Sequence, residues 1–576
     1  MGMEILLPRM PCWPRVREGK HKKMPRKVKN VLFIMCDQLR WDYLSCAGHP
    51  TLKTPNIDAL AKRGVRFTRA YVQSPICGPS RMSFYTGRYM NSHGSNWNGI
   101  PLNVGELTMG DYYRALGVET VLVGKTHMTA DKEGMERLGI DPKSIIGVRV
   151  SECGFDPYER DDGLHGRGPA GTRDPQPRYN RYLNEKGYEG ENPWHDWANA
   201  AEGEGNELAS GWAMKNARKP ARVKEEDSET PYMTRRGMDF IREAGDKPWC
   251  VHLSYIKPHW PYIAPAPYNA MYSAKDVVPV VRSEEERNNP HPVVKAFQEY
   301  LIGKSFARDE VREEVIPVYM GLIKQIDDQM GVLFEFLQDG GYFDNTMIVF
   351  TSDHGDYLGD HWLGEKELFH EPSVKVPLII FDPSAEADAA RGTTCDELVE
   401  AIDLAPTFLE AFGGDATKES HRLEGRSLLS LVAGRKPEQW RNYVVSEYDY
   451  SIQYGSAFTS APSDQRLFMI ADKEWKYVHA IGFRPMLFDL RNDPQELKDL
   501  GSDLKYADVR QRYSERLAEW GLRQSQRVTR SEEQIKGMRG RAQQFGILIG
   551  VWDETDIDDK YWGRYRGDSA DTLLKK

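Results

Sequence analysis

Short apolar runs recur along the first 380 residues of the chain. They occupy residues 31–36, 120–123, 250–255, 347–350 and 378–381, and most of their positions are hydrophobic on both faces of an extended strand. Strands of this kind are typical of a parallel sheet that is covered by helices on either side. The pattern therefore predicts that these five runs are strands of one buried parallel sheet.

Between the apolar runs, hydrophobic residues recur with the period of a helix. Thr54 and Pro55 are a favourable cap and first-turn pair, so we expect a helix from there to Gly64. Pro317 is expected to open a longer helix that ends at residues 340–341. One face of that helix carries Leu322, Ile326, Met330, Leu333 and Leu337. Strands that alternate with helices predict a doubly wound α/β domain.

Two later regions break this alternation. Residues 151–236 are rich in Gly, Pro, Asp, Glu and Trp without clear periodicity, and we expect a long excursion over the sheet edge that shapes a pocket. Beyond residue 440 the strand signals become short and predict a small antiparallel subdomain, closed by a turn at 492–494. These signals lie at residues 443–445, 467–470, 475–478 and 486–488.

The last part of the chain is expected to begin with a charged helix and to end in an apolar arm. The arm contains an apolar run at 547–552 and the aromatic residues Tyr561, Trp562 and Tyr565. Such an arm docks on a partner subunit or packs back on its own chain, and the pattern leaves both open. We expect a homo-oligomer, a dimer before a tetramer. The predicted organisation is a basic extension (1–29), an α/β domain (30–440), a subdomain (441–500) and the helix with its arm (501–576).

Composition places the chain among ordinary globular proteins. Of its 576 residues, 40% are hydrophobic and 28% are charged. At roughly 150 residues per domain the length suggests three or four units, although large α/β domains often exceed that size. No apolar stretch approaches the roughly 20 residues that span a bilayer, and the apolar run at 5–7 is too short for a signal peptide. We therefore expect a cytoplasmic protein without a membrane partner.

The net charge of −9 is unevenly distributed. Residues 1–29 carry nine Lys or Arg and two Glu, a charge of +7, so the rest of the chain carries −16. A basic tail can bind nucleic acid, but only Trp13 interleaves it and the body of the protein is acidic, which opposes such binding. We expect a solvated extension and no nucleic-acid partner.

The seven cysteines do not form a disulfide framework, because their number is odd and no two of them are spaced as CxxC. Most are expected to be reduced and to act as small apolar residues. Cys36 and Cys250 lie within predicted strands and are most simply core residues.

Ionisable side chains follow four of the predicted strands. In chain order they are Asp37 with Gln38, Lys125 with His127, Lys257 with His259, and Asp353 with His354. Each has an ordinary structural explanation when taken alone, such as a capped turn at Asp353, a solvated turn at Lys125 or a satisfied buried imidazole at His259. In open α/β sheets, however, ligands bind at the carboxyl ends of the strands. Four strands that deliver such groups to one edge predict a functional site.

One segment resembles the signature of a known family. The sequence Ile76-Cys77-Gly78-Pro79-Ser80-Arg81, followed by Thr-Gly-Arg at 86–88, is similar to the sulfatase signature C-x-P-S-R…TGR. The blocks around Asp37 and at residues 54–58, 124–127 and 351–355 resemble, in order, blocks of the alkaline phosphatase and sulfatase superfamily. The resemblance covers about residues 30–500 and includes the family's closing subdomain near 487–494. It implies a mixed sheet flanked by helices.

The resemblance also implies the chemistry. In this family the signature cysteine, here Cys77, is oxidised to Cα-formylglycine, so a formylglycine-generating enzyme is an expected partner. The aldehyde hydrates to a diol: one hydroxyl attacks sulfur to give a covalent intermediate, and the second expels the sulfate. A divalent metal lowers the pKa of the diol and neutralises the sulfuryl oxygens. Pro79 suits the first turn of a helix, which places Cys77 at a helix N-terminus that favours anions.

Position by position, the resemblance assigns an ion site and the groups around the nucleophile. The implied metal ligands are Asp37, Gln38, the formylglycine at Cys77, Asp353 and His354. Asp353 is also the implied base for the attacking hydroxyl. Arg81, one turn after Cys77, is expected to orient and polarise the diol.

The same comparison assigns the groups that contact the substrate, a small anionic ester. Lys125 and Lys366 are expected to bind the transferred group and the leaving oxygen. His127 assists the breakdown of the intermediate, and His259 is the acid at the leaving group. Asn98 is expected to contact the substrate, although an Asn-Gly turn also arises for backbone reasons.

The sequence departs from the common sulfatase pattern at both metal-binding pairs. Most sulfatases begin with paired aspartates and end with Asp-Asn, whereas the pairs here are Asp37-Gln38 and Asp353-His354, as in the phosphonate monoester hydrolase branch. That branch places Tyr and Thr where this chain has Lys and His, at 125 and 127. An imidazole ligand favours Mn²⁺ or another transition ion over Ca²⁺, which stays open.

Three functions therefore remain open. Sulfate monoesters, phosphonate monoesters and phosphodiesters are all monoanions, so promiscuity among them is expected. Lys125 and His127 add positive charge near the transferred group, which favours sulfate ester hydrolysis by an arylsulfatase. The alternative is a phosphonate monoester hydrolase or phosphodiesterase. A catalytically silent anion-binding protein on the same scaffold is the third possibility.

Overall fold

The structure is a computed structural model that describes residues 28–163, 177–523 and 528–562. Nearly all of the predicted basic extension and the aromatic residue Tyr565 lie outside the described residues. None of the helices in the described part is long and apolar enough to cross a membrane.

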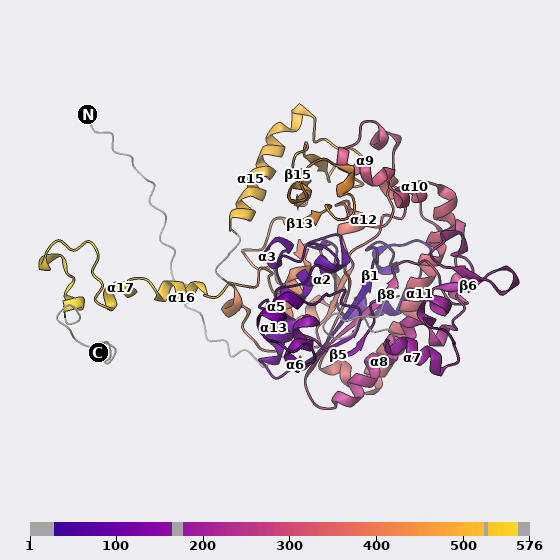
Figure 1. The fold of residues 1–576 in the computed structure, drawn as a ribbon, viewed down its shortest axis with the longest axis horizontal. Helices are drawn as coiled ribbons and strands as arrows, with labels where there is room; N and C mark the ends of the chain where they lie inside the picture. Colours follow the sequence, from indigo (N-terminus) through magenta and orange to yellow (C-terminus); the bar gives the residue numbers. More distant parts are fainter. Residues whose placement is uncertain (1–27, 164–176, 524–527, 563–576) are drawn as a thin grey trace.

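The described chain builds its core around one sheet of eight strands, in the order β11-β2-β10-β9-β1-β8-β4-β5 (Figure 1). The five strands from β9 to β5 are parallel, whereas β10 is antiparallel to both of its neighbours. In sheet order the bounds are Thr393–Cys395, Val65–Phe67, Leu378–Phe381, Thr346–Ser352, Asn30–Asp37, Trp249–Pro258, Glu119–Gly124 and Asp156–Arg160. The predicted α/β fold with a mixed sheet is confirmed. The expectation that residues 378–381 form a parallel strand is wrong, because double-sided burial does not fix strand direction.

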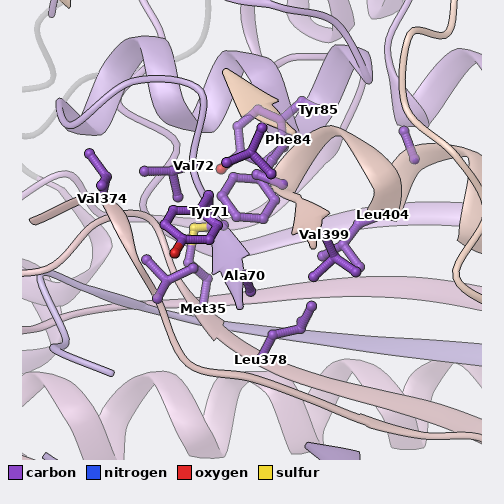
Figure 2. Close-up of a cluster of buried hydrophobic side chains, with 14 of the residues drawn as sticks. Met35, Ala70, Tyr71, Val72, Phe84, Tyr85, Val374, Leu378, Val399 and Leu404 are labelled. Atoms are coloured by element: carbon purple, nitrogen blue, oxygen red, sulfur yellow. The ribbon is translucent and has the colours of Figure 1, made fainter. Parts of the chain in front are cut away.

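Helices cover both faces of this sheet, and alternate residues of β1 show it. Val31 and Phe33 belong to one hydrophobic cluster, whereas Leu32 and Ile34 belong to another. The first cluster also takes in Phe84 of α2 (Cys77–Thr86), as Figure 2 shows, and side chains of α13 (Leu404–Ala411). The second is closed by α1 (Pro55–Arg63), α8 (Glu229–Ala244) and α11 (Asp309–Asp339). Two separate cores thus clamp the strands and fix the edge from which the polar groups project.

The long helix α11 begins earlier than the sequence suggests. It starts at Asp309, so Pro317 lies inside it and the expected start at Pro317 is wrong. A proline in a helix interior removes one backbone hydrogen bond, but the helix continues through it because Val311, Val315 and Ile316 are buried in the core. The predicted apolar face, from Leu322 to Leu337, is buried as expected.

The segment 151–236 contains more regular structure than its composition predicts. It includes the edge strand β5, the helix α7 (Arg178–Glu185) and the beginning of α8. The strand has the sequence Asp-Pro-Tyr-Glu-Arg and, among the described strands, pairs with β4 alone, so it is half-exposed and lacks the apolar run of a central strand. For this reason a search for apolar runs could not find it.

A second sheet in the described chain has four antiparallel strands and follows the main domain. Its strands β13 to β16 are neighbours in chain order, as predicted for the C-terminal subdomain. They span Val444–Asp449, Arg466–Ala471, Trp475–Ala480 and Met486–Asp489. The helix α15 (Ala507–Arg523) packs on this sheet through Tyr513, Leu517 and Trp520. The predicted domain boundaries stay predictions.

The chain after α15 leaves the body of the protein as an arm. It carries the short helices α16 (Glu532–Gly537) and α17 (Arg541–Gln544), drawn in yellow in Figure 1. Ile549 is 90% exposed and Trp552 is 91% exposed, so the apolar run is not packed against the body.

Candidate active site

The carboxyl ends of four parallel strands converge on one buried spot. Asp37 ends β1, Lys125 follows β4, His259 follows β8 and Asp353 follows β9. The register between β1 and β8 shifts at Asp37, which pairs with Pro258 instead of continuing the ladder. Such an irregularity re-aims a side chain at the end of a strand. It separates Asp37 from the core and turns it toward the neighbouring strand ends.

Cys77 reaches the same spot from the first turn of α2. All ten residues of this helix are buried, and Cys77 itself is 1% exposed. The Gly78 N–H donates to Asn98 Oδ1 at 2.7 Å. A Cβ on Gly78 would lie 2.7 Å from that oxygen, so only glycine allows Asn98 to hold the start of the helix. The structure therefore places Asn98 beside Cys77 as a cap of α2.

Four potential ligands surround one point. Single atoms of Asp37, Cys77, Asp353 and His354 all lie within 4.8 Å of one another, and all four residues are buried. His354 Nε2 is 3.0 Å from Cys77 Sγ and 3.6 Å from Asp37 Oδ1. The Nδ1 of His354 contacts the Gly355 carbonyl at 2.9 Å, which leaves Nε2 unprotonated toward the cluster. Two carboxylates and an imidazole aimed at one point fit a divalent transition ion.

A buried arginine neutralises the two carboxylates. Arg81 Nε donates to Asp353 Oδ2 at 2.8 Å, and its Nη2 lies 3.2 Å from Asp37 Oδ2. Its Nη1 donates to the Lys125 carbonyl and to Ser254 Oγ, each at 2.8 Å. The guanidinium is fully buried and uses all three nitrogens. Arg81 thus fixes the orientation of both aspartates, a role in addition to the one expected from the sequence.

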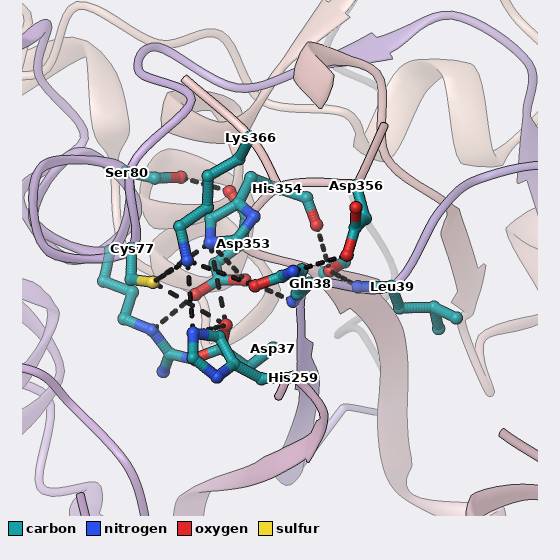
Figure 3. Close-up of polar contacts among 12 residues, drawn as sticks. Asp37, Gln38, Leu39, Cys77, Ser80, His259, Asp353, His354, Asp356 and Lys366 are labelled. Atoms are coloured by element: carbon teal, nitrogen blue, oxygen red, sulfur yellow. Dashed lines mark hydrogen bonds and ion pairs between the residues drawn. The ribbon is translucent and has the colours of Figure 1, made fainter. Parts of the chain in front are cut away.

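Two lysines contact members of this cluster, and Figure 3 shows one of them, Lys366. Lys125 Nζ is 2.5 Å from Asp37 Oδ2. Lys366 Nζ lies 3.3 Å from Cys77 Sγ and 3.1 Å from His259 Nε2. Burial raises the pKa of Asp37, but the charges of Lys125 and Arg81 outweigh it and hold the pKa well below its usual range. The carboxylate therefore stays ionised and available to an ion.

His259 lies next to Lys366. Its Nδ1 is 2.7 Å from the Trp260 carbonyl, so its Nε2 is the end that faces the site. Burial and the neighbouring Lys366 lower the pKa of His259 well below its usual value. The imidazole is consequently neutral at neutral pH.

His127 is placed less directly. Its backbone N–H donates to Asp162 Oδ1 at 2.9 Å, and its φ of 58° lies in the left-handed region. Its Nδ1 is buried without a hydrogen-bond partner among the residues that the structure describes. The structure brings Asp37, Gln38, Cys77, Asp353, His354, Arg81, Lys125, Lys366 and His259 into one connected network, and it places His127 after Lys125 without such a contact.

Several buried neighbours of the site carry no sequence signal. Asp356 and Tyr262 contact the Gln38 amide, and Ser254 contacts Arg81. Trp260 Nε1 donates to Glu365 Oε1 at 2.9 Å beside Lys366. Asp356 follows His354 by two positions and could have been suspected on that ground. Nothing in the local pattern singles out Tyr262, Ser254, Trp260 or Glu365.

A cavity of about 360 Å³ lies away from this network. It is formed between the loop 285–294 and the C-terminal subdomain, and its walls include His361, His370 and Arg484. None of its lining residues belongs to the network around Cys77. The reactive groups therefore lie in the buried network and not in this cavity.

Comparisons with known proteins agree with the geometry. The model of the sulfatase family matches residues 29–414, and that of the N-sulphoglucosamine sulphohydrolase C-terminal region matches 359–523. PehA of Trinickia caryophylli, a multifunctional alkaline phosphatase superfamily protein, is 32% identical over 87% of this chain and 96% of its own length. An arylsulfatase of Clostridium perfringens is 28% identical, covering 83% of this chain and 91% of that protein.

Two solved structures share the fold. The phosphonate monoester hydrolase of Agrobacterium radiobacter has a TM-score of 0.73 at 30% identity, covering 85% of this chain and 95% of that chain. The phosphonate monoester hydrolase SpPMH of Silicibacter pomeroyi has a TM-score of 0.75 at 27% identity, covering 87% and 96%. With a family model over most of the main domain and a relative 32% identical along nearly its whole length, this chain belongs to the sulfatase family.

Proposed function

We propose that the protein hydrolyses sulfate monoesters, with a divalent ion and with Cys77 matured to Cα-formylglycine. The observation that carries this proposal is the position of Cys77 at the N-terminus of α2. Its Sγ lies 3.0 Å from His354 Nε2 and 3.3 Å from Lys366 Nζ. A nucleophile at that point has ion ligands on one side and an ammonium on the other, which suits attack on a monoanionic ester.

The unmodified thiol is a poor nucleophile in this place. Burial and the Asp37 carboxylate raise the pKa of Cys77 to about 12, so little thiolate exists at neutral pH. Sγ marks the position where a matured residue 77 carries oxygen, and a hydrated aldehyde supplies one hydroxyl for attack and another for product release. A divalent ion, when bound, lowers the pKa of that nucleophile. Attack by a hydroxyl of the matured residue is compatible with the high pKa of the thiol, whereas catalysis by a thiolate is not.

The chain's own residues then have distinct tasks. Lys366 contacts both the Cys77 side chain and His259, so its charge can stabilise the transferred group and the leaving oxygen. Arg81 and Lys125 keep Asp37 ionised for the ion. We assign the proton for the leaving group to His259, whose Nε2 faces the site. An anionic ester nearby raises the pKa of this imidazole and lets it gain that proton.

Two tryptophans support an aryl leaving group. The Trp260 ring packs on His259 with 4.3 Å between ring centroids, and Trp212 meets Trp260 edge-on at 5.1 Å. Trp212 is 41% exposed, so this aromatic ledge opens to solvent beside the leaving-group side of the site. A flat leaving group gains stacking there that a methyl group does not. Trp212 comes from the excursion 151–236, which the sequence also suggested as a pocket wall.

A phosphonate monoester hydrolase is the second candidate. The observation that favours it is His354 in the ion cluster, together with a 30% identical phosphonate monoester hydrolase of the same fold. Lys125 argues for sulfate, because it adds a cation next to Asp37. The decisive measurement is kcat/KM for one phenol leaving group on sulfate and on phenylphosphonate. A preference for phenylphosphonate would reverse the order of the two proposals.

Three finer points belong to the same proposal. We assign Mn²⁺ to the ion site ahead of Ca²⁺, because His354 contributes nitrogen where Ca²⁺ prefers oxygen. Maturation of Cys77 requires a formylglycine-generating enzyme, and mass spectrometry of the Cys77 peptide should find sulfur and two hydrogens replaced by one oxygen.

The exposed arm with Ile549 and Trp552 is assigned to contacts between subunits of a homo-oligomer. An unchanged number of subunits in solution after deletion of residues 540–576 would contradict that assignment.

A further inference from the structure

Gln38 has an unusual backbone that is held on both sides. Its φ of 66° lies in the left-handed region, which is strained for a residue with a side chain and persists only when neighbours enforce it. Its N–H donates to Asp353 Oδ1 at 3.1 Å, and its carbonyl accepts from the Tyr319 hydroxyl at 2.7 Å. The backbone therefore delivers the side chain to one fixed place beside the ion cluster.

The side-chain amide of Gln38 is fixed as well, and its two ends have opposite partners. Nε2 donates to Asp356 Oδ2 at 2.5 Å and to the Tyr262 hydroxyl at 3.3 Å. Oε1 accepts from Lys366 Nζ at 3.1 Å. A rotated amide would place its oxygen against a carboxylate and its NH₂ against an ammonium. One orientation satisfies every partner, and the other satisfies none of the charged ones.

Asp356 is itself immobilised, so it can impose this orientation. Its Oδ2 accepts from the Tyr262 hydroxyl at 2.6 Å, and its Oδ1 accepts from the Leu358 N–H at 3.0 Å. Both Asp356 and Tyr262 are buried. Figure 3 shows Asp356 on the side of Gln38 opposite Lys366 and Cys77. The carboxylate is thus outside the ion cluster and acts on it only through the amide.

We propose that Asp356, held by Tyr262, is a positioning residue that makes Gln38 present its carbonyl oxygen to Lys366 and to the ion cluster. The inference rests on the proposed function for the presence of an ion. An amide oxygen is a ligand for Mn²⁺ and an acceptor for an ammonium, whereas an amide NH₂ is neither. Asp356 and Tyr262 therefore decide whether residue 38 attracts or repels the two cations of the site.

Ion affinity in the full-length protein tests this proposal without reference to turnover. We expect Asp356→Asn to weaken Mn²⁺ binding by about 10–100-fold in isothermal titration calorimetry, the usual effect of losing a partner that orients a ligand. Tyr262→Phe should weaken it less, by a few fold, since the Asp356 contact survives. Tyr255→Phe, a buried tyrosine whose hydroxyl contacts Thr234 instead, is the matched control and should bind Mn²⁺ like the wild type.

A reciprocal exchange separates positioning from a general loss of packing. In the double variant Q38E/D356N the donor moves to residue 356 and the acceptor to residue 38, so an oxygen again faces the cluster. We expect Q38E alone to bind Mn²⁺ weakly, because two carboxylates then face each other. The double variant is expected to bind Mn²⁺ at least tenfold more tightly than D356N. The melting temperature measured without ion checks that each variant is folded.

The outcomes distinguish this inference from the proposed function. Wild-type protein that binds no divalent ion would overturn the proposed function and the positioning role with it. Normal binding by the wild type and by D356N would overturn the positioning role alone. A double variant that binds no better than D356N would also overturn it, because packing loss, unlike orientation, is not restored by exchanging donor and acceptor.

Discussion

Arg81 and Asp353 form an ion pair of 2.8 Å in which both side chains are completely shielded from solvent. The same guanidinium lies 3.2 Å from Asp37, so one cation serves two carboxylates from different strands. Burial lowers the pKa of Arg81, but Asp353 and the other neighbouring anions outweigh it and raise the pKa well above its usual value. The positive charge of Arg81 is therefore part of the site, and removing it alone would leave buried carboxylates unbalanced.

Removal of this cation should destabilise the whole domain. Without bound ion, Arg81→Ala is expected to lower the free energy of unfolding by about 3–5 kcal/mol, because it leaves the buried Asp353 without its arginine partner and Asp37 with Lys125 alone. Urea denaturation measures the loss. Arg242→Ala, an exposed helical arginine, is the control and should change the value by less than about 0.5 kcal/mol. A loss below about 1 kcal/mol in Arg81→Ala would show that Lys125 suffices to balance the site.

Serine at position 77 should separate the two halves of the reaction. Cys77→Ser supplies a hydroxyl for attack but no second hydroxyl to expel the product, so we expect one equivalent of phenol and then arrest. Cys77→Ala should release none and lose at least about 10³-fold in steady-state rate. Stopped-flow measurement of phenol release checks both. Sustained turnover by the alanine variant would contradict any nucleophile at this position.

The double exchange Lys125→Tyr with His127→Thr should change the choice of ester. It removes one cation next to Asp37 and one imidazole, which disfavours the transition state with more charge on the transferred oxygens. We expect the ratio of kcat/KM for sulfate over phenylphosphonate to fall by roughly tenfold. The comparison is made at saturating Mn²⁺, so that weaker ion binding is not mistaken for a change of substrate preference. An unchanged ratio would mean that these residues do not set it.

The aromatic ledge should matter only for aryl leaving groups. Trp212→Ala is expected to lower kcat/KM for a phenyl ester about 2–10-fold, the range given by one aromatic contact. Trp212→Phe should retain most of the rate, and a methyl ester should not distinguish the three proteins. Equal losses of kcat/KM for phenyl and methyl esters would mean that Trp212 stabilises the excursion 151–236 and does not contact the leaving group.

A buried acid outside the site predicts a pH effect on stability. Burial raises the pKa of Glu447 to about 8, although the Asn91 N–H donates to it. The folded state therefore holds a proton that the unfolded state releases above its ordinary pKa, about 4.3, so stability falls as pH rises from there to about 8. The loss is at most about 1.4 kcal/mol per pH unit. Glu447→Gln should flatten this slope in urea denaturation between pH 5 and 8, and an equally steep slope would contradict it.

Much of this architecture could be predicted from the sequence, because its signals are local. Central strands such as β1 and β9 are apolar on both faces, and a signature such as Cys77 to Arg81 is contiguous. The edge strand β5 escaped prediction because one-sided pairing removes the need for apolar residues. The start of α11 was misplaced because burial of the residues before Pro317 outweighs the missing hydrogen bond.

Long-range contacts set the limit within the site. Nothing in the sequence near Tyr262 shows that its hydroxyl meets Asp356, 94 residues away. The second role of Arg81, which orients both aspartates, depends on β1 and β9 lying side by side with Asp37 and Asp353 at their ends. Residue types and order could therefore name the members of the site, but not the partners that orient them.

The burial of α2 limits when the Cys77 side chain can be modified. Cys77 is 1% exposed and lies within a helix whose every residue is covered. An enzyme can oxidise a side chain only where it can reach it, and the folded chain covers this position. If Cys77 is matured as proposed, its oxidation therefore has to precede the burial of α2, and a molecule that folds with an unconverted thiol stays inactive until it unfolds.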